Sequence, residues 1–338
     1  MNPSNLKLYE LKFTTPIHIS NERGDYTSGS MRIHSDTMYA AIWFSFNKLG
    51  FSDLIPNLEN AGNTLFTISS LFPYLTYNNQ KIRFLPRPLN TNDNRFDAAE
   101  DTRLRKMIKK VSWVDTKIFV DLLNDIVPNA FKSKEFINGQ FWASKDLPNF
   151  SFVKSHIIPR AMVPREDNKD TTIFYIERYY FDDNAGLYFL ANFENKEIEK
   201  AFDIALNYLS EEGLGTDRNI GNGKFEVKKM DNDLILETSR QRSLSINLGL
   251  FCPSSQTDVE FGVESEFAAY ELVKRGGWIS EPYNTLRKKS VYMFKEGSVF
   301  NNKVKESMFY QGENVDLKPD ILNEYPIWRC GKTLFLTF

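Results

Sequence analysis

The spacing of apolar and polar positions in the first half of the chain predicts alternating strands and helices. Residues 6–13 alternate as a strand does, and residues 38–49 are apolar on almost every side, as in a buried helix. Residues 63–89 predict two strands joined by a turn at Asn78 and Asn79. A further strand is predicted at 187–193. Each strand run is short, so the pattern favours a mixed α+β fold.

A second helix and a closing strand follow these elements. Residues 197–212 have the helical spacing of an amphipathic helix, whose predicted apolar face consists of Ile198, Phe202, Ala205, Leu206 and Leu209. Residues 224–230 alternate again and predict the closing strand. Taken together, strand, helix, central strands, helix and strand make the βαββαβ order of a ferredoxin-like, RRM-like domain, with long insertions in the middle. A sheet of this kind commonly binds RNA on its open face.

The insertion at residues 155–181 predicts an extended, protruding β-hairpin. Pro159 and Pro164 flank Arg160 and the apolar residues 161–163, and proline keeps such an arm from pairing as a central strand. An exposed arginine beside apolar side chains suits a single-stranded nucleic acid, because it pairs with phosphate while the apolar groups wedge between bases. The alternative is an ordinary hairpin that covers the edge of a core.

The loop at residues 211–225, EEGLGTDRNIGNGKF, contains four glycines between the second helix and the closing strand. Gly213 stands where a helix C-cap favours a left-handed residue. Glycine-rich backbone offers N–H groups that can cradle a phosphate, and Arg218 and Lys224 add positive charge. The alternative is a mobile surface loop. The spacing is not that of a Walker loop, and the loop does not follow a strand and open a helix as a dinucleotide fingerprint does.

The last hundred residues predict a second, smaller and degenerate ferredoxin-like domain. We predict strands at 244–251, 289–294 and 298–299, a helix at 261–273, and a final strand pair around Gly331 within 326–338. The predicted division is therefore residues 1–235 for the first domain and 240–338 for the second.

Composition limits the classes of function. The 338 residues are 41% hydrophobic and 14% aromatic, as in proteins with packed cores. The net charge of −2 gives no overall attraction to nucleic acid, so RNA binding would require a local basic surface. Two distant cysteines and three histidines argue against a disulfide framework or a zinc site, and we expect no metal and no cofactor. The N-terminus lacks a secretory pattern and no apolar run could span a membrane, so the expected location is cytoplasmic, away from any membrane.

Few residues suggest catalysis. His18, His34 and Asp36 are expected near one end of the first strand–helix unit, where Ser35 or Asp36 is the predicted helix N-cap. The basic segment 103–110, RLRKMIKK, predicts a helix whose charged face is either solvated or a binding surface.

Several motifs together resemble the RAMP superfamily of CRISPR proteins. These are residues 16–18 (PIH), 34–41 (HSDTMYAA), 68–73 with 84–88, and the glycine loop, followed by 270–279, 287–300 and 326–338 near the C-terminus. The resemblance covers nearly the whole chain. Within the superfamily it is strongest to the subunit family that caps the 5′ handle of the crRNA in type III-A (Csm) effector complexes.

The resemblance implies a non-catalytic, RNA-binding scaffold of antiviral defence. Such a subunit holds the repeat-derived 5′ handle of the crRNA, anchors the large polymerase-Palm subunit, adjoins a backbone RAMP subunit, and is not a homo-oligomer. The hairpin bends the guide next to the handle. The residues that carry over as RNA-binding positions are Gly213, Gly215, Thr216, Asp217, Arg218, Asn219, Gly221, Asn222, Gly223, Lys224, His18, Ser35, Asp36, Arg160 and Arg165.

Three alternatives remain open at the level of sequence. Some RAMP relatives cut CRISPR repeat RNA without metal, which would need His18 or His34 as general acid or base. The chain could equally be the corresponding subunit of a type III-B complex, or a protein-interaction module that binds no RNA.

Overall fold

The structure is a computed structural model that describes residues 6–19, 27, 29–61, 64–90, 102–126, 136–137, 139–145, 147, 152–164, 170–234, 236, 244–264, 267–279, 283, 285–301, 312–322 and 325–338. Arg165 and the boundary positions 235 and 240 lie outside these residues. In the described part of the chain, no helix has both the length and the apolar character that crossing a membrane requires.

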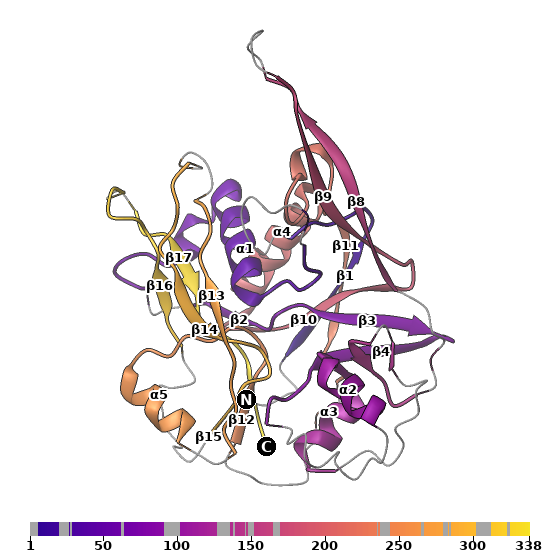
Figure 1. Ribbon diagram of the computed structural model, residues 1–338. Helices are drawn as coiled ribbons and strands as arrows, with labels where there is room; N and C mark the ends of the chain where they lie inside the picture. Colours follow the sequence, from indigo (N-terminus) through magenta and orange to yellow (C-terminus); the bar gives the residue numbers. More distant parts are fainter. Residues whose placement is uncertain are drawn as a thin grey trace.

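Sheets dominate the fold, with few helices (Figure 1). The helices are α1 (Ser35–Leu49), α2 (Thr102–Lys110), α3 (Thr116–Leu123), α4 (Lys196–Glu212) and α5 (Gln256–Val263), with short 3₁₀ turns η2 (Ser52–Leu54) and η5 (Arg218–Ile220). The strands up to the glycine loop and just beyond it are β1 (Lys7–Phe13), β2 (Phe66–Ile68), β3 (Phe72–Tyr77), β4 (Gln80–Pro86), β5 (Trp113–Asp115), β6 (Phe136–Ile137), β7 (Phe141–Trp142), β8 (Val153–Met162), β9 (Thr172–Phe181), β10 (Ala185–Phe193) and β11 (Phe225–Asp231). The remaining strands are β12 (Leu244–Asn247), β13 (Leu272–Arg275), β14 (Val291–Phe294), β15 (Val299–Asn301), β16 (Asn314–Asp316), β17 (Trp328–Cys330) and β18 (Phe335–Thr337).

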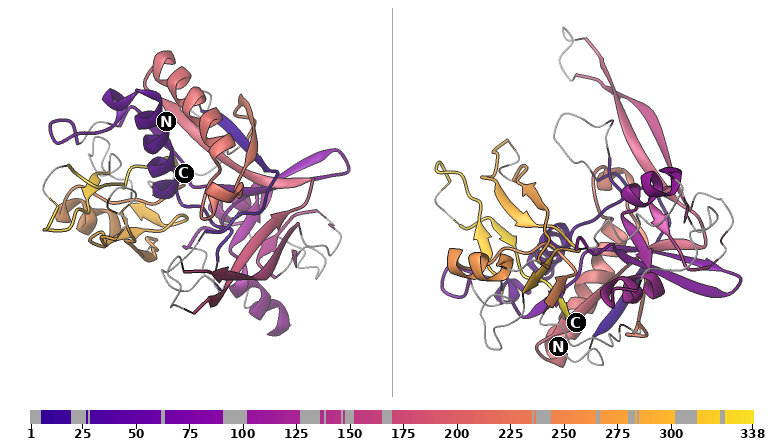
Figure 2. Two further views of the ribbon diagram at one scale, coloured as in Figure 1. Left: turned by 90° about the horizontal axis from the view of Figure 1, so that it is seen from above. Right: turned by 60° about the horizontal axis from the view of Figure 1, so that its bottom comes forward.

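The first half contains the predicted βαββαβ order. Strands β11, β1, β10 and β3 lie side by side and antiparallel. Strand β2 pairs with the C-terminal end of β10, and β3 pairs with its N-terminal half. Between β3 and β4 the chain turns at Asn78 and Asn79, both with positive φ, as predicted. The insertion adds β4, β5, β7 and β6 to the same sheet. The predicted hairpin is confirmed as a separate two-stranded sheet, β8 with β9, which projects from the molecule in Figures 1 and 2.

Helix α4 forms where its apolar spacing predicts it. All five predicted apolar residues are buried, and the side chain of Asn195 caps the helix by accepting the N–H groups of Glu197 and Ile198. The helix ends at Gly213 with φ of 86° and ψ of 162°, so glycine is required there, although the residue is extended rather than left-handed helical. The predicted cap of α1 is wrong: the N-cap position is His34, whose side chain makes no capping hydrogen bond.

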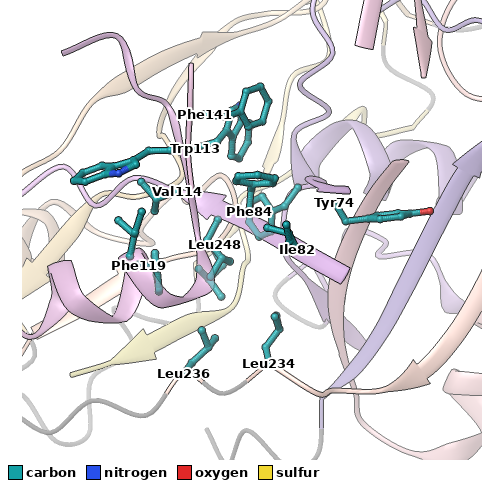
Figure 3. Packing of buried hydrophobic residues seen from close by; sticks show 14 of the residues in the cluster. Tyr74, Ile82, Phe84, Trp113, Val114, Phe119, Phe141, Leu234, Leu236 and Leu248 are labelled. Atoms are coloured by element: carbon teal, nitrogen blue, oxygen red, sulfur yellow. The ribbon is translucent and has the colours of Figure 1, made fainter. Parts of the chain in front are cut away.

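Both faces of the central sheet are buried, which corrects the expectation of an open RNA-binding face. Helices α1 and α4 cover one face and form one hydrophobic core with Tyr9 and Leu11. On the other face Leu8 and Leu190 belong to a core that also contains residues of the C-terminal part, among them Leu244, Ile246, Leu248, Leu334 and Phe338. Figure 3 draws Leu234, Leu236 and Leu248 in the same cluster as Phe84 and Trp113 of the insertion. The central sheet therefore leaves only its loops and edges, and the hairpin, for contact with a ligand.

The C-terminal part differs from the predicted second domain. Its strands form one three-stranded sheet, β15-β12-β18, and two two-stranded sheets, β13-β14 and β16-β17. The predicted helix at 261–273 is wrong, since α5 ends at Val263 and residues 272–275 pair with β14 instead. The predicted strand pair at the end is also wrong, because β17 pairs with β16 while β18 pairs with β12. A second ferredoxin-like domain stays a prediction.

Candidate nucleic-acid interface

The glycine loop between α4 and β11 is a compact structure, held mainly by its own backbone. Gly213, Gly215, Asp217, Gly221 and Gly223 have positive φ, so the chain reverses direction repeatedly over a short span. The N–H of Leu214 donates to the carbonyl of Gly223 (2.9 Å), and the N–H of Asn222 donates to that of Asp217 (3.3 Å). These bonds close the loop on itself.

Three further N–H groups of the glycine loop donate to the segment after β1. The N–H of Gly223 donates to Pro16 O, that of Thr216 donates to His18 O, and that of Lys224 donates to the hydroxyl of Thr15. The amide of Gly213 is used by the end of α4, and that of Gly221 bonds Arg218 O. Fewer N–H groups are therefore available to a phosphate than the four-glycine loop predicts from its sequence. Of the N–H groups of the glycine loop, those of Gly215, Asp217, Arg218 and Asn219 donate to no acceptor among the described residues.

The side chains at the tip of the loop differ from those at its base. Arg218 and Asn219 are exposed on η5, and the Arg218 guanidinium lies 5.4 Å from the ring centroid of Phe44. Asn222 is buried, and Lys224 lies 3.6 Å from Glu211 in a solvent-exposed ion pair. Of the predicted loop contacts, those at the tip are available to a ligand and those at the base hold the loop.

Asp217 joins the glycine loop to the hairpin. It has left-handed backbone (φ 64°), and its carboxylate accepts hydrogen bonds from Arg160 (3.2 Å) and Arg178 (3.0 Å). These arginines lie on one face of the hairpin, because His156 pairs with Arg178 in the β8–β9 register and Arg160 follows four residues after His156. The predicted site residues Arg160 and Asp217 therefore contact each other.

His18 is the second connection between the glycine loop and the hairpin. Its ring is buried, with Nδ1 2.6 Å from the carbonyl of Glu177, so Nδ1 donates; its own carbonyl accepts from Thr216. Next to it, Ile17 and Tyr179 exchange two backbone hydrogen bonds. We call this set of contacts, formed by residues 16–18, 177–179, Arg160 and Asp217, the hairpin junction. It holds the base of the hairpin against the glycine loop.

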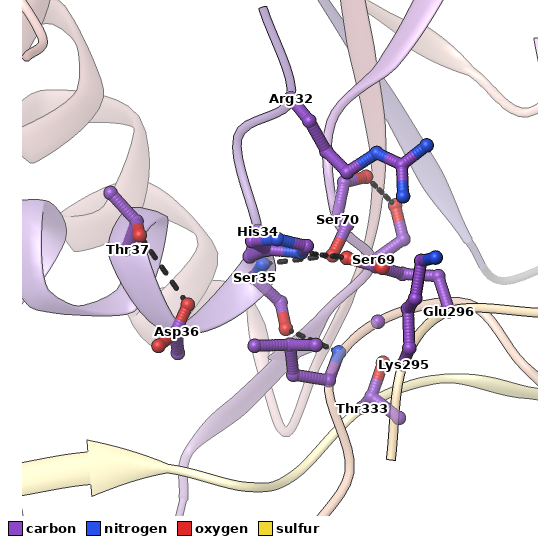
Figure 4. Close-up of polar contacts among 12 residues, drawn as sticks. Arg32, His34, Ser35, Asp36, Thr37, Ser69, Ser70, Lys295, Glu296 and Thr333 are labelled. Carbon is purple, nitrogen blue, oxygen red and sulfur yellow. Dashed lines mark hydrogen bonds and ion pairs between the residues drawn. The ribbon is translucent and has the colours of Figure 1, made fainter. Parts of the chain in front are cut away.

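His34, Ser35 and Asp36 lie elsewhere, between the N-terminal helix and the C-terminal part (Figure 4). The Asp36 carboxylate accepts from Arg275 (2.8 and 3.0 Å) and from Arg329 (2.8 Å). Burial alone would raise the pKa of Asp36, but Arg329 and then Arg275 hold it well below its usual range. The N-cap role predicted for this aspartate is wrong, since its carboxylate binds two arginines from distant strands.

Further contacts complete this second cluster. Glu296 is buried and accepts from His34 and from the hydroxyl of Ser70, while the hydroxyl of Ser35 accepts the N–H of Leu250 (2.9 Å). Burial would raise the pKa of Glu296, but His34, Ser70 and Arg32 lower it to about 2. Since Ser35 and Asp36 are buried in these contacts, the structure gives them a packing role and no exposed surface for RNA.

The outer half of the hairpin exposes apolar side chains. Ile157, Val163, Ile173 and Tyr175 are each more than half exposed, at 58, 71, 65 and 52%. The register Pro159–Tyr175 and Ala161–Ile173 places Ile157, Ile173 and Tyr175 on one face, opposite to the face that carries Arg160. Exposed apolar patches of this kind mark interaction surfaces in soluble proteins.

Sequence reasoning missed the partners that give these residues their roles. They are Glu177, Arg178, Arg275, Glu296 and Arg329, and the ion pairs of Asp36 span more than 230 residues. No local pattern signals such a pair. Among the described residues, no group of three or more His, Cys, Asp or Glu side chains could hold a metal ion.

The sequence is similar to proteins named Csm4. Residues 240–338 match the family model described as the CRISPR Csm4 C-terminal domain. The chain is 24% identical over 320 residues to a CRISPR system Csm4 protein of Streptococcus thermophilus, which covers 93% of this chain and 92% of the relative. It is also 24% identical over 312 residues to a Csm4 protein of Mycobacterium tuberculosis, with 91% of each chain covered.

The fold is found in solved structures. A chain in the crystal structure of a Csm3–Csm4 subcomplex of the type III-A CRISPR–Cas interference complex matches with a TM-score of 0.65 and 22% identity, covering 98% of this chain and 99% of that one. A chain in the crystal structure of a Csm1–Csm4 cassette with AMPPNP matches with a TM-score of 0.59 and 17% identity, covering 98 and 97%. The arrangement of elements is thus shared along the whole chain.

Proposed function

We propose that this chain is a member of the Csm4 family and acts as the crRNA-binding, non-catalytic subunit of a type III-A CRISPR interference complex. In this role it holds the repeat-derived 5′ handle of the crRNA. It also anchors the large polymerase-Palm subunit and adjoins a backbone RAMP subunit. The observation that carries the proposal is the hairpin junction, which brings the glycine loop and the hairpin together at one place on the surface.

The glycine loop supplies the handle contacts. Its tip presents Arg218 and Asn219 together with backbone N–H groups that no protein acceptor in the described residues takes up. Backbone amides and an arginine suit phosphate, because both donate hydrogen bonds to anionic oxygens. The rigid base of the loop supports the proposal, since bonds to Pro16, Thr15 and His18 hold the tip in place before a ligand arrives.

The hairpin supplies the second part of the role. Its exposed apolar face has the chemistry to wedge between bases of the guide next to the handle, and Asp217 fixes the angle at which it leaves the glycine loop. The sequence resemblance assigns guide bending to this hairpin, and the exposure of Ile157, Ile173 and Val163 supports that assignment.

The histidine contacts favour a scaffold over a nuclease. A general acid or base must reach its substrate, whereas the His18 ring is 1% exposed and donates to Glu177 O. His34 is less enclosed, but its Nδ1 is already bonded to the buried Glu296. The proposed partners follow from the names of related structures, which contain Csm4 together with Csm3 or with Csm1.

The test is to express the chain with its neighbouring subunits, purify through a tag on this chain, and sequence the bound RNA. We expect guide RNAs that share one repeat-derived 5′ end. Arg218→Glu should reduce the recovery of that end, whereas Lys200→Glu, an exposed change on α4, should leave it unchanged. Recovery of the complex without RNA would indicate a pure interaction module.

A parallel assay separates scaffold from nuclease. The purified chain is incubated with repeat RNA in EDTA, and the proposal expects intact RNA. Cleavage that is lost in His18→Ala or His34→Ala would make the chain a metal-independent processing ribonuclease.

A further inference from the structure

Two neighbouring clefts lie between the hairpin junction and the C-terminal part, and together we call them the groove. Their volumes are about 690 and 300 Å³, and they share Ser30, Met31 and Gln140 as walls. The smaller cleft is lined at its end by Val153, Ser155 and Tyr179 of the hairpin base, and the larger one reaches Leu272 and Val273 of β13. The groove therefore crosses from one half of the molecule to the other.

The groove and the hairpin junction share their structural support. Gly29 lines the groove, donates its N–H to the Glu177 carboxylate (2.8 Å), and accepts a hydrogen bond from the Tyr179 hydroxyl (2.8 Å). Glu177 also holds His18, which in turn holds the glycine loop. The groove therefore begins at the base of the hairpin, on the face that carries Ser155 and Tyr179. The glycine loop contacts the other face of the hairpin through Arg160 and Arg178.

The walls of the large cleft carry more positive than negative charge. Arg32, Lys110 and Lys295 line it, against the single carboxylate of Glu271, which is paired with Lys295. In the described part of the chain, Arg32 and Lys110 make no ion pair, although Arg32 helps to lower the pKa of the nearby Glu296. This local excess contrasts with the net charge of −2 for the whole protein.

Arg32 is held in place by stacking. Its guanidinium carbon lies 4.8 Å from the ring centroid of the buried Trp113, so the planar group is fixed while its N–H edge stays available. Lys110 is exposed at the end of α2 and adds a mobile ammonium. A fixed guanidinium beside a flexible ammonium is a combination that suits phosphate oxygens along a strand.

We propose that this groove binds the single-stranded RNA that continues from the hairpin junction, with Arg32 and Lys110 contacting its phosphates. The proposal rests on the proposed function, because it takes the handle-bearing RNA as the ligand. It assigns the basic end of α2, which sequence analysis left between a solvated face and a binding surface, to RNA binding. It also gives the chain a second binding surface, separate from the glycine loop.

The experiment measures binding of the full-length chain to a synthetic RNA with the 5′ handle, over a series of salt concentrations. The Arg32→Ala/Lys110→Ala variant should bind about tenfold more weakly or worse. Its dependence of log affinity on log salt should be shallower by roughly 1.4, because each lost phosphate contact to a single strand removes about 0.7. Arg32→Lys keeps the charge but not the stacked plane, so it should retain the slope with intermediate affinity.

Two controls make the result specific. Lys196→Ala/Lys200→Ala removes two exposed lysines of α4 and should change neither affinity nor slope. Lys295→Ala removes a groove lysine that is already paired with Glu271 and should have a smaller effect than the double variant. Should the loss of the Arg32 stack unfold the chain, Lys110→Glu alone still tests the groove, because Lys110 is exposed.

The outcomes distinguish the two proposals. Unchanged affinity and slope in the double variant, with weaker binding in Arg218→Glu, would overturn the groove and leave the proposed function standing. Unchanged RNA binding with loss of a partner subunit from the complex would mean that an acidic protein segment occupies the groove, which also overturns it. If the wild-type chain does not bind handle RNA, the proposed function fails and the groove proposal fails with it.

Discussion

At the scale of single residues, Asp36 shows how a polar motif can be structural. Its carboxylate is fully buried between Arg275 and Arg329, which come from β13 and β17. A buried ion pair costs desolvation of both charges, so such a pair contributes weakly while it is complete and becomes strongly destabilising when one partner is removed. Asp36 therefore sets how α1 sits against the C-terminal strands.

We predict that Asp36→Asn lowers the free energy of unfolding by roughly 3–5 kcal/mol, because two largely buried guanidinium groups lose their anion. Urea unfolding followed by circular dichroism measures this change. As a control, Asp320→Asn removes the ion pair between the exposed Asp320 carboxylate and Lys289. This change should have no measurable effect on the free energy of unfolding. Equal stability of Asp36→Asn and wild type would show that the cluster does not hold the two parts together.

A second prediction concerns pH and Glu296. Its pKa of about 2 in the folded chain lies below the value of 4.5 for an unperturbed glutamate, so the folded state favours the ionised form. The resulting stabilisation is complete above pH 4.5 and is lost as the pH falls through about 2. Glu296→Gln lacks this contribution. The difference in unfolding free energy between wild type and Glu296→Gln should therefore shrink as the pH falls through this range. Urea titrations at several pH values measure this difference. A difference that stays constant with pH would contradict the low pKa of Glu296.

At the scale of elements, the glycine loop can be tested by two glycines with similar backbone. Gly221 (φ +84°) has nothing within 4 Å of an added Cβ, whereas at Gly223 (φ +75°) the Cβ would stand 2.0 Å from the backbone oxygen of Leu214. Gly221→Ala should cost about 1–2 kcal/mol, the price of a left-handed alanine. Gly223→Ala should cost a further 1–3 kcal/mol or so, because backbone must move. Thermal melting of both variants makes the comparison, and similar costs would mean that the loop yields easily.

Elements with a strong local pattern could be predicted from sequence, but their partners could not. The apolar spacing of 198–209 and the alternation on either side of Pro159 predict α4 and the hairpin because each pattern is complete within a short segment. The helix predicted at 261–273 is wrong because Leu272 and Val273 are compatible with a helix or a strand. Their pairing with β14 makes them a strand.

The candidate site follows the same rule. The position of the glycine loop could be predicted from the sequence, because glycine is favoured where the backbone has positive φ. Asp217 was assigned to RNA, yet its position opposite Arg160 and Arg178 depends on how the hairpin folds back onto the loop. The contact of Asp217 with these two arginines depends on tertiary structure, which the spacing of residues along the sequence does not encode.

At the scale of the whole molecule, the two halves share a hydrophobic core. Leu8 and Leu190 of the central sheet pack in one cluster with Leu244, Ile246 and Phe338, and the Asp36 and Glu296 contacts cross the same boundary. A division at 235–240 would expose apolar surface on both sides. Burial of apolar surface is the main favourable term in folding, so neither part retains its full core alone.

We therefore predict that the chain unfolds as one cooperative unit despite its length. The five tryptophans report on both halves, since Trp43, Trp113 and Trp142 precede the boundary and Trp278 and Trp328 follow it. With 5-fluorotryptophan in place of tryptophan, all five fluorine resonances should lose their folded signals at one urea concentration. Earlier loss of the Trp278 and Trp328 signals would show that residues 240–338 are an independent domain, and Asp36→Asn should then not shift the later transition. In the cooperative case Asp36→Asn moves all five transitions together, because the carboxylate, its two arginines and the shared core belong to one folding unit.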